Sequence, residues 1–137
     1  MTMTRWARRL RALLALLAVL TLGVGAPGAQ ASTTNHAAVV VQFADGTTDV
    51  RRISFTEPSI SGLEALRRAG LAIEERAGAV CRVERVGCPA ADCFCAAPQY
   101  WAYYHQRGGQ WQYATTGAAA YQVTDGAVEG WSWGRAL

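Results

Sequence analysis

The sequence predicts an α+β fold in which one helix packs on one face of a mixed β-sheet. Three observations support this prediction. A Val-rich strand and a half-buried return strand, joined by an Asp-Gly turn, come first, over residues 38–55. A single amphipathic helix follows over 61–70. The remainder of the chain alternates in the manner of strands, and a helix covering a sheet is the economical arrangement for that order.

The first 31 residues are expected to be a secretory signal peptide. Four arginines precede an apolar run over 10–24, and Ala29-Gln30-Ala31 provides the small-x-small pattern of signal peptidase, which predicts cleavage after Ala31. The run is short for a bilayer span, so we expect a secreted, extracellular protein without stable membrane insertion. An uncleaved anchor is the alternative. We predict a flexible leader over 32–37 and one domain over 38–137.

The charge balance excludes several classes of function. The chain has 13 Lys and Arg residues and 10 Asp and Glu residues. Four of the basic residues and none of the acids lie in the predicted signal, so the remainder carries nine against ten, a net charge of −1. The high pI therefore gives no support for a nucleic-acid partner. Because the chain contains no Lys, Schiff-base chemistry is also excluded.

The N-terminal half reads as a hairpin followed by a helix. The Val-rich segment 38–43 is a predicted strand, Asp45-Gly46 a predicted turn, and 48–55 the predicted return strand. Ser61 and Glu64 form a capping box, in which each side chain satisfies a free backbone N–H of the first helical turn. Gly70 is placed to end the helix in the left-handed conformation. We then expect a polar turn or edge segment over 74–79 and a strand over 80–86.

The four cysteines lie between residues 81 and 95, in a predicted loop over 87–97. An even number of cysteines in a secreted chain predicts disulfides. We favour the nested pairing, Cys81 with Cys95 and Cys88 with Cys93, because it avoids a strained link between Cys93 and Cys95. The pairing of Cys81 with Cys93 and of Cys88 with Cys95 stays open. A zinc site is the rival hypothesis, but the spacing lacks two CxxC knuckles.

Aromatic residues dominate the last third of the chain, where they fall at every second position, as in strands. We predict three strands that share an aromatic face of one antiparallel sheet. The predicted helix offers only Leu63 and Leu66 as an apolar stripe, so some rings should stay exposed and mark a binding surface. The alternative is a core face packed under the helix. The predicted ligand contacts are Trp101, Tyr103, Trp111 and Tyr113, with Trp131 and Trp133 nearer the core.

Two motifs give the chain a resemblance to a known family. The run from Tyr121 to Trp133, with its Val-x-Asp-Gly and Trp-x-Trp elements, and the upstream Tyr-Trp-x-Tyr and Gly-Gly-Gln-Trp-x-Tyr patterns resemble the transcobalamin C-terminal-like domains. That resemblance implies a β-grasp-like fold, ββα followed by further strands, and a corrinoid such as cobalamin as ligand. Ala127 replaces the acid of the family pattern, and the cysteine-rich insert is not part of it.

No arrangement in the sequence supports catalysis. Gly130-Trp131-Ser132-Trp133-Gly134 matches the nucleophile-elbow pattern, but Ser132 alternates between two Trp on a predicted strand, and no acid or His follows it. His105, at the end of an aromatic strand, is a candidate axial ligand for corrinoid cobalt and more simply a solvated turn residue. We expect no catalytic residues, no metal ligands and no resident cofactor.

The sequence therefore favours a secreted, non-enzymatic ligand-binding module that takes a corrinoid or another flat ligand on an aromatic sheet face. The alternative is an extracellular interaction or adhesion module whose partner is another secreted or cell-surface protein.

Overall fold

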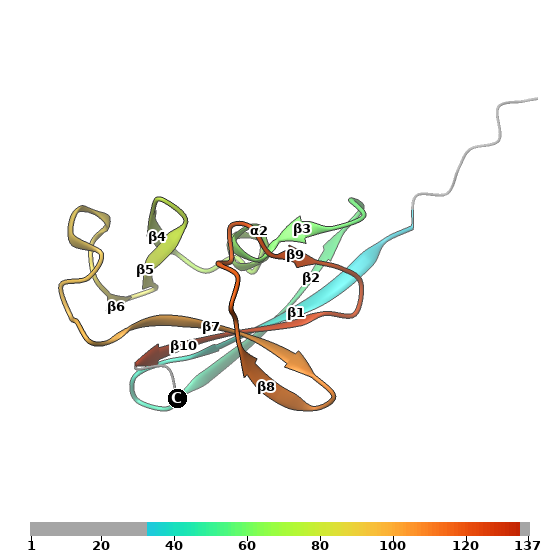
Figure 1. Ribbon diagram of the computed structural model, residues 1–137. Helices are drawn as coiled ribbons and strands as arrows, with labels where there is room; N and C mark the ends of the chain where they lie inside the picture. The colour runs from blue at the N-terminus through green and yellow to red at the C-terminus, as the bar shows by residue number, and fades with distance from the viewer. Residues whose placement is uncertain (1–32, 135–137) are drawn as a thin grey trace, which may run out of the picture. The chain divides into compact units, whose positions relative to one another are not determined.

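The computed structural model describes residues 33–134. Its centre is a five-stranded sheet in the order β2-β1-β10-β7-β8 (Figure 1). The strands are β1 (Asn35–Gln42), β2 (Thr48–Phe55), β7 (Tyr100–Arg107), β8 (Gln110–Tyr113) and β10 (Val128–Gly134). β1 and β10 run parallel and the other neighbours are antiparallel, so the sheet is mixed, as predicted.

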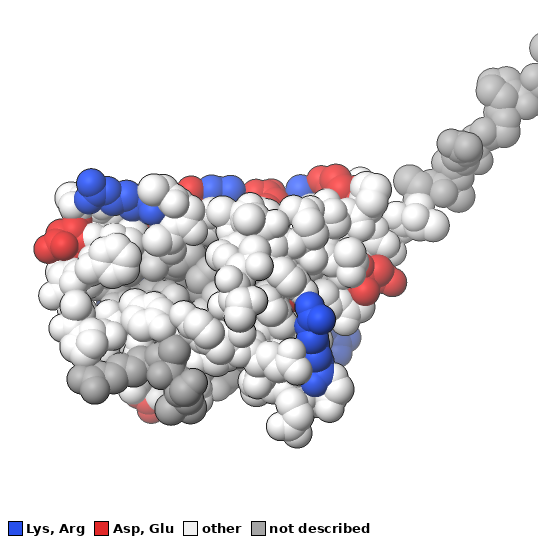
Figure 2. Space-filling model, in the orientation of Figure 1, with Lys and Arg blue, Asp and Glu red and all other residues white. Residues whose placement is uncertain are grey.

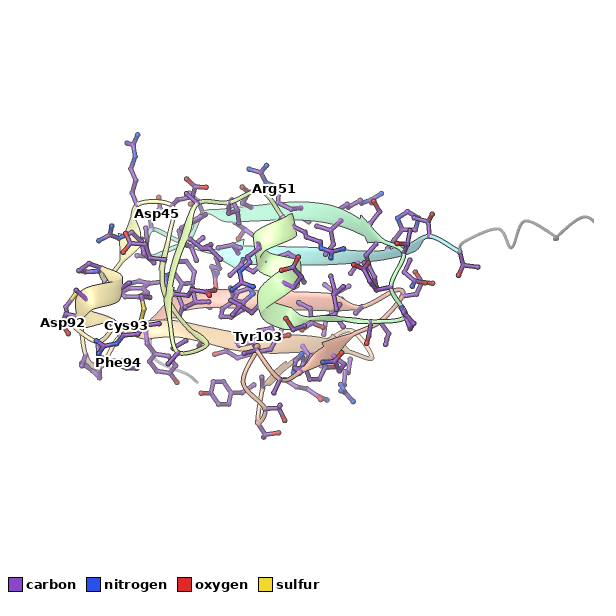
Figure 3. The ribbon with its side chains drawn as sticks, turned by 90° about the horizontal axis from the view of Figure 1, so that it is seen from above. Asp45, Arg51, Asp92, Cys93, Phe94 and Tyr103 are labelled. Carbon is purple, nitrogen blue, oxygen red and sulfur yellow. A yellow bond between two sulfur atoms is a disulfide. The ribbon has the colours of Figure 1, made fainter. Side chains whose placement is uncertain are left out.

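Smaller elements cover one face of this sheet. The helix α2 (Gly62–Arg68) follows the short strand β3 (Ile60–Ser61), which pairs with β9 (Gln122–Val123). A three-stranded sheet contains β4 (Ile73–Arg76), β5 (Ala79–Val83) and β6 (Val86–Gly87), and the 3-10 turn η1 (Ala90–Asp92) follows. Viewed from above, α2 lies across the long strands (Figure 3). Within residues 33–134 no helix is long and apolar enough to cross a membrane.

The helix begins and ends largely as its sequence predicts. Ser61 Oγ accepts a hydrogen bond from Glu64 N at 3.1 Å, and Gly70 has φ +75°. The second half of the capping box is replaced, since the Glu64 carboxylate accepts instead from Arg68 Nε at 2.9 Å. Leu63 and Leu66 are buried against the sheet. With them lie Val39, Val41, Ile53, Phe55, Trp101, Tyr103 and Trp131, which form the core.

Two predicted boundaries are wrong. The leader over 32–37 is too long, because β1 begins at Asn35 and pairs with β2 from there, Asn35 opposite Phe55. The single strand over 80–86 is two strands, because Glu84 adopts φ +53° in a tight turn between β5 and β6. The predicted signal peptide and its cleavage site lie outside the described residues.

The disulfides join Cys81 to Cys93 and Cys88 to Cys95, so the favoured nested pairing is wrong and the alternative is formed. The β5–β6 pair places Cys88 beside Cys81, with Cys88 N donating to Cys81 O at 2.8 Å. The segment between Cys88 and Cys93 is not a closed loop but a helical turn. Ala90 N donates a hydrogen bond to Glu74 Oε2 at 2.8 Å, which holds this turn against β4. This turn leads the chain back to Cys81, with the Cα atoms of Cys81 and Cys93 4.7 Å apart.

Candidate functional site

The five-stranded sheet has a helix-facing side and an open side, and residues paired across neighbouring strands point to the same one. Tyr103 pairs with Trp131, and Trp101 with Trp133. These four rings point toward the helix and its neighbours. Trp101, Tyr103 and Trp131 are buried there at 5%, 6% and 4% exposure, and the Trp131 ring stacks on Tyr103 at a centroid distance of 4.7 Å.

The aromatic residues of β8 lie on the open side instead. A two-residue turn at Gly108-Gly109 pairs Arg107 with Gln110, and this register places Tyr113 opposite Tyr104 rather than Tyr103. Shifting a pairing by one residue moves every side chain of a strand to the other face. The prediction that the three aromatic strands share one face is therefore wrong. Of the four predicted contacts, Trp111 and Tyr113 are 45% and 46% exposed, and Trp101 and Tyr103 are buried beneath the other face.

Four aromatic residues on the open side form a surface that we call the ring platform: Tyr100, Tyr104, Trp111 and Tyr113. The hydroxyls of Tyr100 and Tyr113 are 3.1 Å apart, and this hydrogen bond raises the pKa of Tyr113 above its ordinary value, with burial adding to the effect. The rings of Tyr104 and Tyr113 meet edge to face at 5.5 Å. These contacts pack the three tyrosine rings of the platform against one another.

Trp111 depends on a glycine for its position. A Cβ on Gly130 would lie 2.6 Å from Trp111 Cζ3, so the indole reaches across β7 and rests on the bare backbone of β10. Any side chain at position 130 would push the ring away. Gly130 thereby sets the place of the largest ring on the open side.

A shallow hollow of about 290 Å³ adjoins these residues on the same side of the sheet, and His36, Arg52, Ala38 and Val128 are among the residues that line it. His36 N donates to Asp125 Oδ1 at 2.8 Å, which ties β1 to the turn before β10. Neither His36 nor Arg52 is among the site residues predicted from the sequence. His36 falls within the predicted leader. The alternation of Val50 and Arg52 in the return strand was the signal that could have placed Arg52 here.

The open side carries little charge. The strand registers within residues 33–134 assign each residue of the five strands to one side of the sheet. Among those on the open side, Arg52 alone has a formal charge at neutral pH. Ion pairs gather instead around α2 and β4, as between Arg68 and Glu57 at 2.7 Å, and charged side chains line the upper margin of the surface over these elements (Figure 2). A nearly uncharged surface with aromatic rings suits an uncharged or weakly charged flat partner.

The helix-facing side holds a buried polar cluster. Glu129 Oε2 accepts from the Tyr103 hydroxyl at 2.5 Å and lies 2.7 Å from His105 Nδ1. Burial, and then the hydrogen bond to Glu129, raise the pKa of Tyr103 far above its ordinary value, so this hydroxyl stays protonated. His105 also stacks on Tyr121 at 3.7 Å and is 7% exposed. His105 is therefore enclosed in the core, so the simpler expectation of a solvated turn residue is wrong, and the ring is not available at the surface as a candidate cobalt ligand.

Other chemistry finds no support in residues 33–134. Ser132 Oγ is 3.3 Å from the amide oxygen of Gln42, which is no general base. No group of three or more His, Cys, Asp or Glu side chains in this part of the chain is arranged to hold a metal ion.

An open cleft of about 500 Å³ lies between the β1–β2 turn and the β5–β6 turn, lined by Phe43, Asp45, Glu84 and Arg85 among others.

One family model matches the C-terminal part of the chain, and two solved structures are similar to it in fold. Residues 94–136, which contain β7, β8 and β10, match the SCO2322-like domain. A crystal structure from Ruminococcus gnavus ATCC 29149, of a protein proposed to bind metal, is similar at a TM-score of 0.51 and 19% identity, covering 75% of this chain and 99% of that one.

Haptocorrin in complex with Cbi is similar at a TM-score of 0.56 and 18% identity. The match covers 79% of this chain and 27% of haptocorrin, so the likeness concerns one part of that protein. No curated protein sequence matches the chain. At these identities the two structures are similar in fold, and the chemistry of the site has to be argued from its own residues.

Proposed function

We propose that this chain is a secreted, non-enzymatic ligand-binding module with a β-grasp-like fold, and that a corrinoid is the ligand class it takes on the open side of its sheet. The observation that carries the proposal is the ring platform, which lies on the same side of the sheet as a shallow hollow lined by Arg52 and His36. The structural likeness to haptocorrin, solved with Cbi, and the transcobalamin-like motifs of β7, β8 and β10 support the same ligand class.

Each part of the open side has a role in this proposal. Trp111 and Tyr113 offer exposed ring surface against which the corrin macrocycle packs, and the contact removes apolar surface of both from water. The guanidinium of Arg52, in the hollow, donates hydrogen bonds to amide or phosphate oxygens at the ligand's periphery. His36 supplies an imidazole on the same side, the side-chain type that most often coordinates transition metals.

Equilibrium dialysis against cyanocobalamin and cobinamide tests the proposal on the mature chain. We expect binding that Trp111→Ala weakens about tenfold or more, corresponding to about 1.4 kcal/mol. Phe94→Ala is the matched control, because Phe94 is also an exposed aromatic ring, at 64% exposure, in the disulfide loop beyond the end of the sheet (Figure 3). Absence of binding at high micromolar corrinoid, or an equal loss in both variants, would contradict the proposal.

A protein partner is the second candidate function, and the shallowness of the open side favours it. The hollow of about 290 Å³ is at the lower limit of small-molecule sites, which occupy about 300–1,000 Å³. Flat aromatic surfaces are also typical of protein interfaces. If neither corrinoid binds while Trp111→Ala abolishes capture of an extracellular protein that Phe94→Ala still captures, this second function replaces the first.

A further inference from the structure

The sheet ends at β8, whose outer edge has no neighbouring strand in the described chain (Figure 1). All four of its residues are exposed. Ala114 N donates to Tyr103 O at 2.9 Å, so Ala114 and Tyr103 are a hydrogen-bonded pair. Hydrogen-bonded and non-hydrogen-bonded pairs alternate along an antiparallel ladder, so Gln112 and Gln110 are the next residues of β8 that exchange hydrogen bonds with β7. The backbone N–H and C=O groups of Trp111 and Tyr113 therefore point away from the sheet, and no backbone group of residues 33–134 pairs with them.

The opposite edge strand, β2, carries charged residues that oppose pairing with another chain, and β8 carries none. Three of four consecutive residues in β2 are charged, Asp49, Arg51 and Arg52, and Asp49 pairs with Arg51 at 2.7 Å. Charges on an edge strand are a common device against pairing with another chain. β8 reads Gln-Trp-Gln-Tyr, with no charge and no proline. Only its short length limits association.

We propose that β8 is the edge at which two copies of this chain pair, antiparallel, about a twofold axis through Gln112. Trp111 of one copy then exchanges both backbone hydrogen bonds with Tyr113 of the partner subunit, and Tyr113 with Trp111 of the partner subunit. The pattern is self-complementary, as a twofold interface requires. A predicted net charge near −1 after signal cleavage opposes self-association only weakly.

This pairing extends the binding surface. The twofold axis between antiparallel strands is perpendicular to the sheet, so the open sides of both copies face the same way. Residues that pair across strands share a face, so Trp111 of each copy and Tyr113 of the partner subunit lie on the same, open side. Each Trp111 ring extends away from the axis, over its own β7 to Gly130, so the two ring platforms stand side by side on one sheet of ten strands. The inference does not depend on which ligand binds that surface, and its test is made without ligand.

Gln112 provides the sharpest test, because it lies opposite its own copy on the axis and is exposed. We expect sedimentation equilibrium of the mature chain, at up to about 1 mM, to show a monomer–dimer equilibrium. Gln112→Arg and Gln112→Glu each place like charges opposite each other and should weaken the dimer at least tenfold. An equimolar mixture of the two variants should recover it as a heterodimer.

Val50→Arg is the matched control, because Val50 is exposed at the other edge of the sheet, in β2, and this variant should leave the dimer unchanged. Circular dichroism of each variant verifies folding. A chain that is monomeric at all concentrations contradicts the proposal, even if it binds a corrinoid. A dimer that Val50→Arg disrupts and Gln112→Arg does not would place the interface elsewhere. Failure of the mixture to associate excludes pairing about Gln112.

Discussion

Gly130 is the residue on which the open side depends most closely. Its lack of a Cβ lets the Trp111 indole rest on the β10 backbone. The position of the largest ring on the open side therefore depends on a residue in another strand. A glycine in the interior of a strand usually weakens it, and one explanation for its presence is the close approach of another group. Here that group is the indole ring.

Gly130→Ala should therefore reduce corrinoid binding while leaving the fold intact. The new Cβ meets the ring of an exposed side chain, which can turn away toward solvent, so the cost in stability should be small. We expect a loss of affinity close to that of Trp111→Ala and a midpoint of urea unfolding near that of the parent. The double variant should lose no more than either single one. An additive loss would show that the ring and the glycine act independently.

The buried cluster around Glu129 acts on stability rather than on binding. Tyr103→Phe removes the hydroxyl that donates to Glu129 and leaves a carboxylate at 1% exposure with His105 as its remaining partner. We expect a loss of about 1–3 kcal/mol in the free energy of unfolding, measured with urea. Tyr113→Phe is the control, because its hydroxyl is at the surface, and it should cost much less. Equal effects would contradict a special role for the buried hydroxyl.

At the scale of elements, the ion pairs that join α2 to the segment after β2 make stability depend on pH. Hydrogen bonds from Arg68 lower the pKa of Glu57 from 4.5 to about 2. A carboxyl whose pKa is lowered in the folded state stabilises the protein fully above its ordinary pKa, and that contribution disappears as the pH falls through the lowered value. We expect the melting temperatures of the parent and Arg68→Gln to differ at pH 6, to approach each other steadily below about pH 4.5, and to converge only below about pH 2. A constant difference would contradict this linkage.

The cysteine loop shows how a short helical turn decides connectivity. Digestion of the non-reduced protein with trypsin, Asp-N protease and chymotrypsin separates the four cysteines, since Arg82, Asp92 and Phe94 lie between them. We expect the peptide with Cys81 to be linked to the one with Cys93, and the peptide with Cys88 to the one with Cys95. A Cys81–Cys95 species would restore the nested pairing.

At the scale of the whole molecule, the positions of turns and strands follow from local sequence signals. The side of the sheet on which each side chain lies depends on the pairing register between strands, which those signals do not give. The hairpin turn, the limits of β2, the Ser61 cap and the three aromatic strands follow from local residues. The distribution of rings between two faces does not follow from alternation within each strand, because pairing sets which positions are opposite. Gly108-Gly109 carried that information: a two-residue turn pairs Arg107 with Gln110 and therefore Tyr104 with Tyr113.

Two of the four residues predicted as ligand contacts are exposed, and two are buried. Exposed rings were expected because one short helix could not cover them all, and Trp111 and Tyr113 are indeed exposed. The helix and the elements beside it bury Trp101 and Tyr103, and the exposure of the other two results from their position on the opposite side. His36 and Arg52 meet only through the pairing of β1 with β2, a contact that no single segment reveals.

The central claim is that the open side, and not the helix-facing side, receives the ligand. Indole N–H signals of the ¹⁵N-labelled mature chain, followed by NMR during titration with cobinamide, test it most directly, because its four Trp residues lie at distinct depths. We predict that the Trp111 signal moves while those of Trp101, whose N–H donates to Val86 O at 3.1 Å, and of buried Trp131 stay in place. A shift at Trp101 or Trp131 with none at Trp111 would contradict the claim.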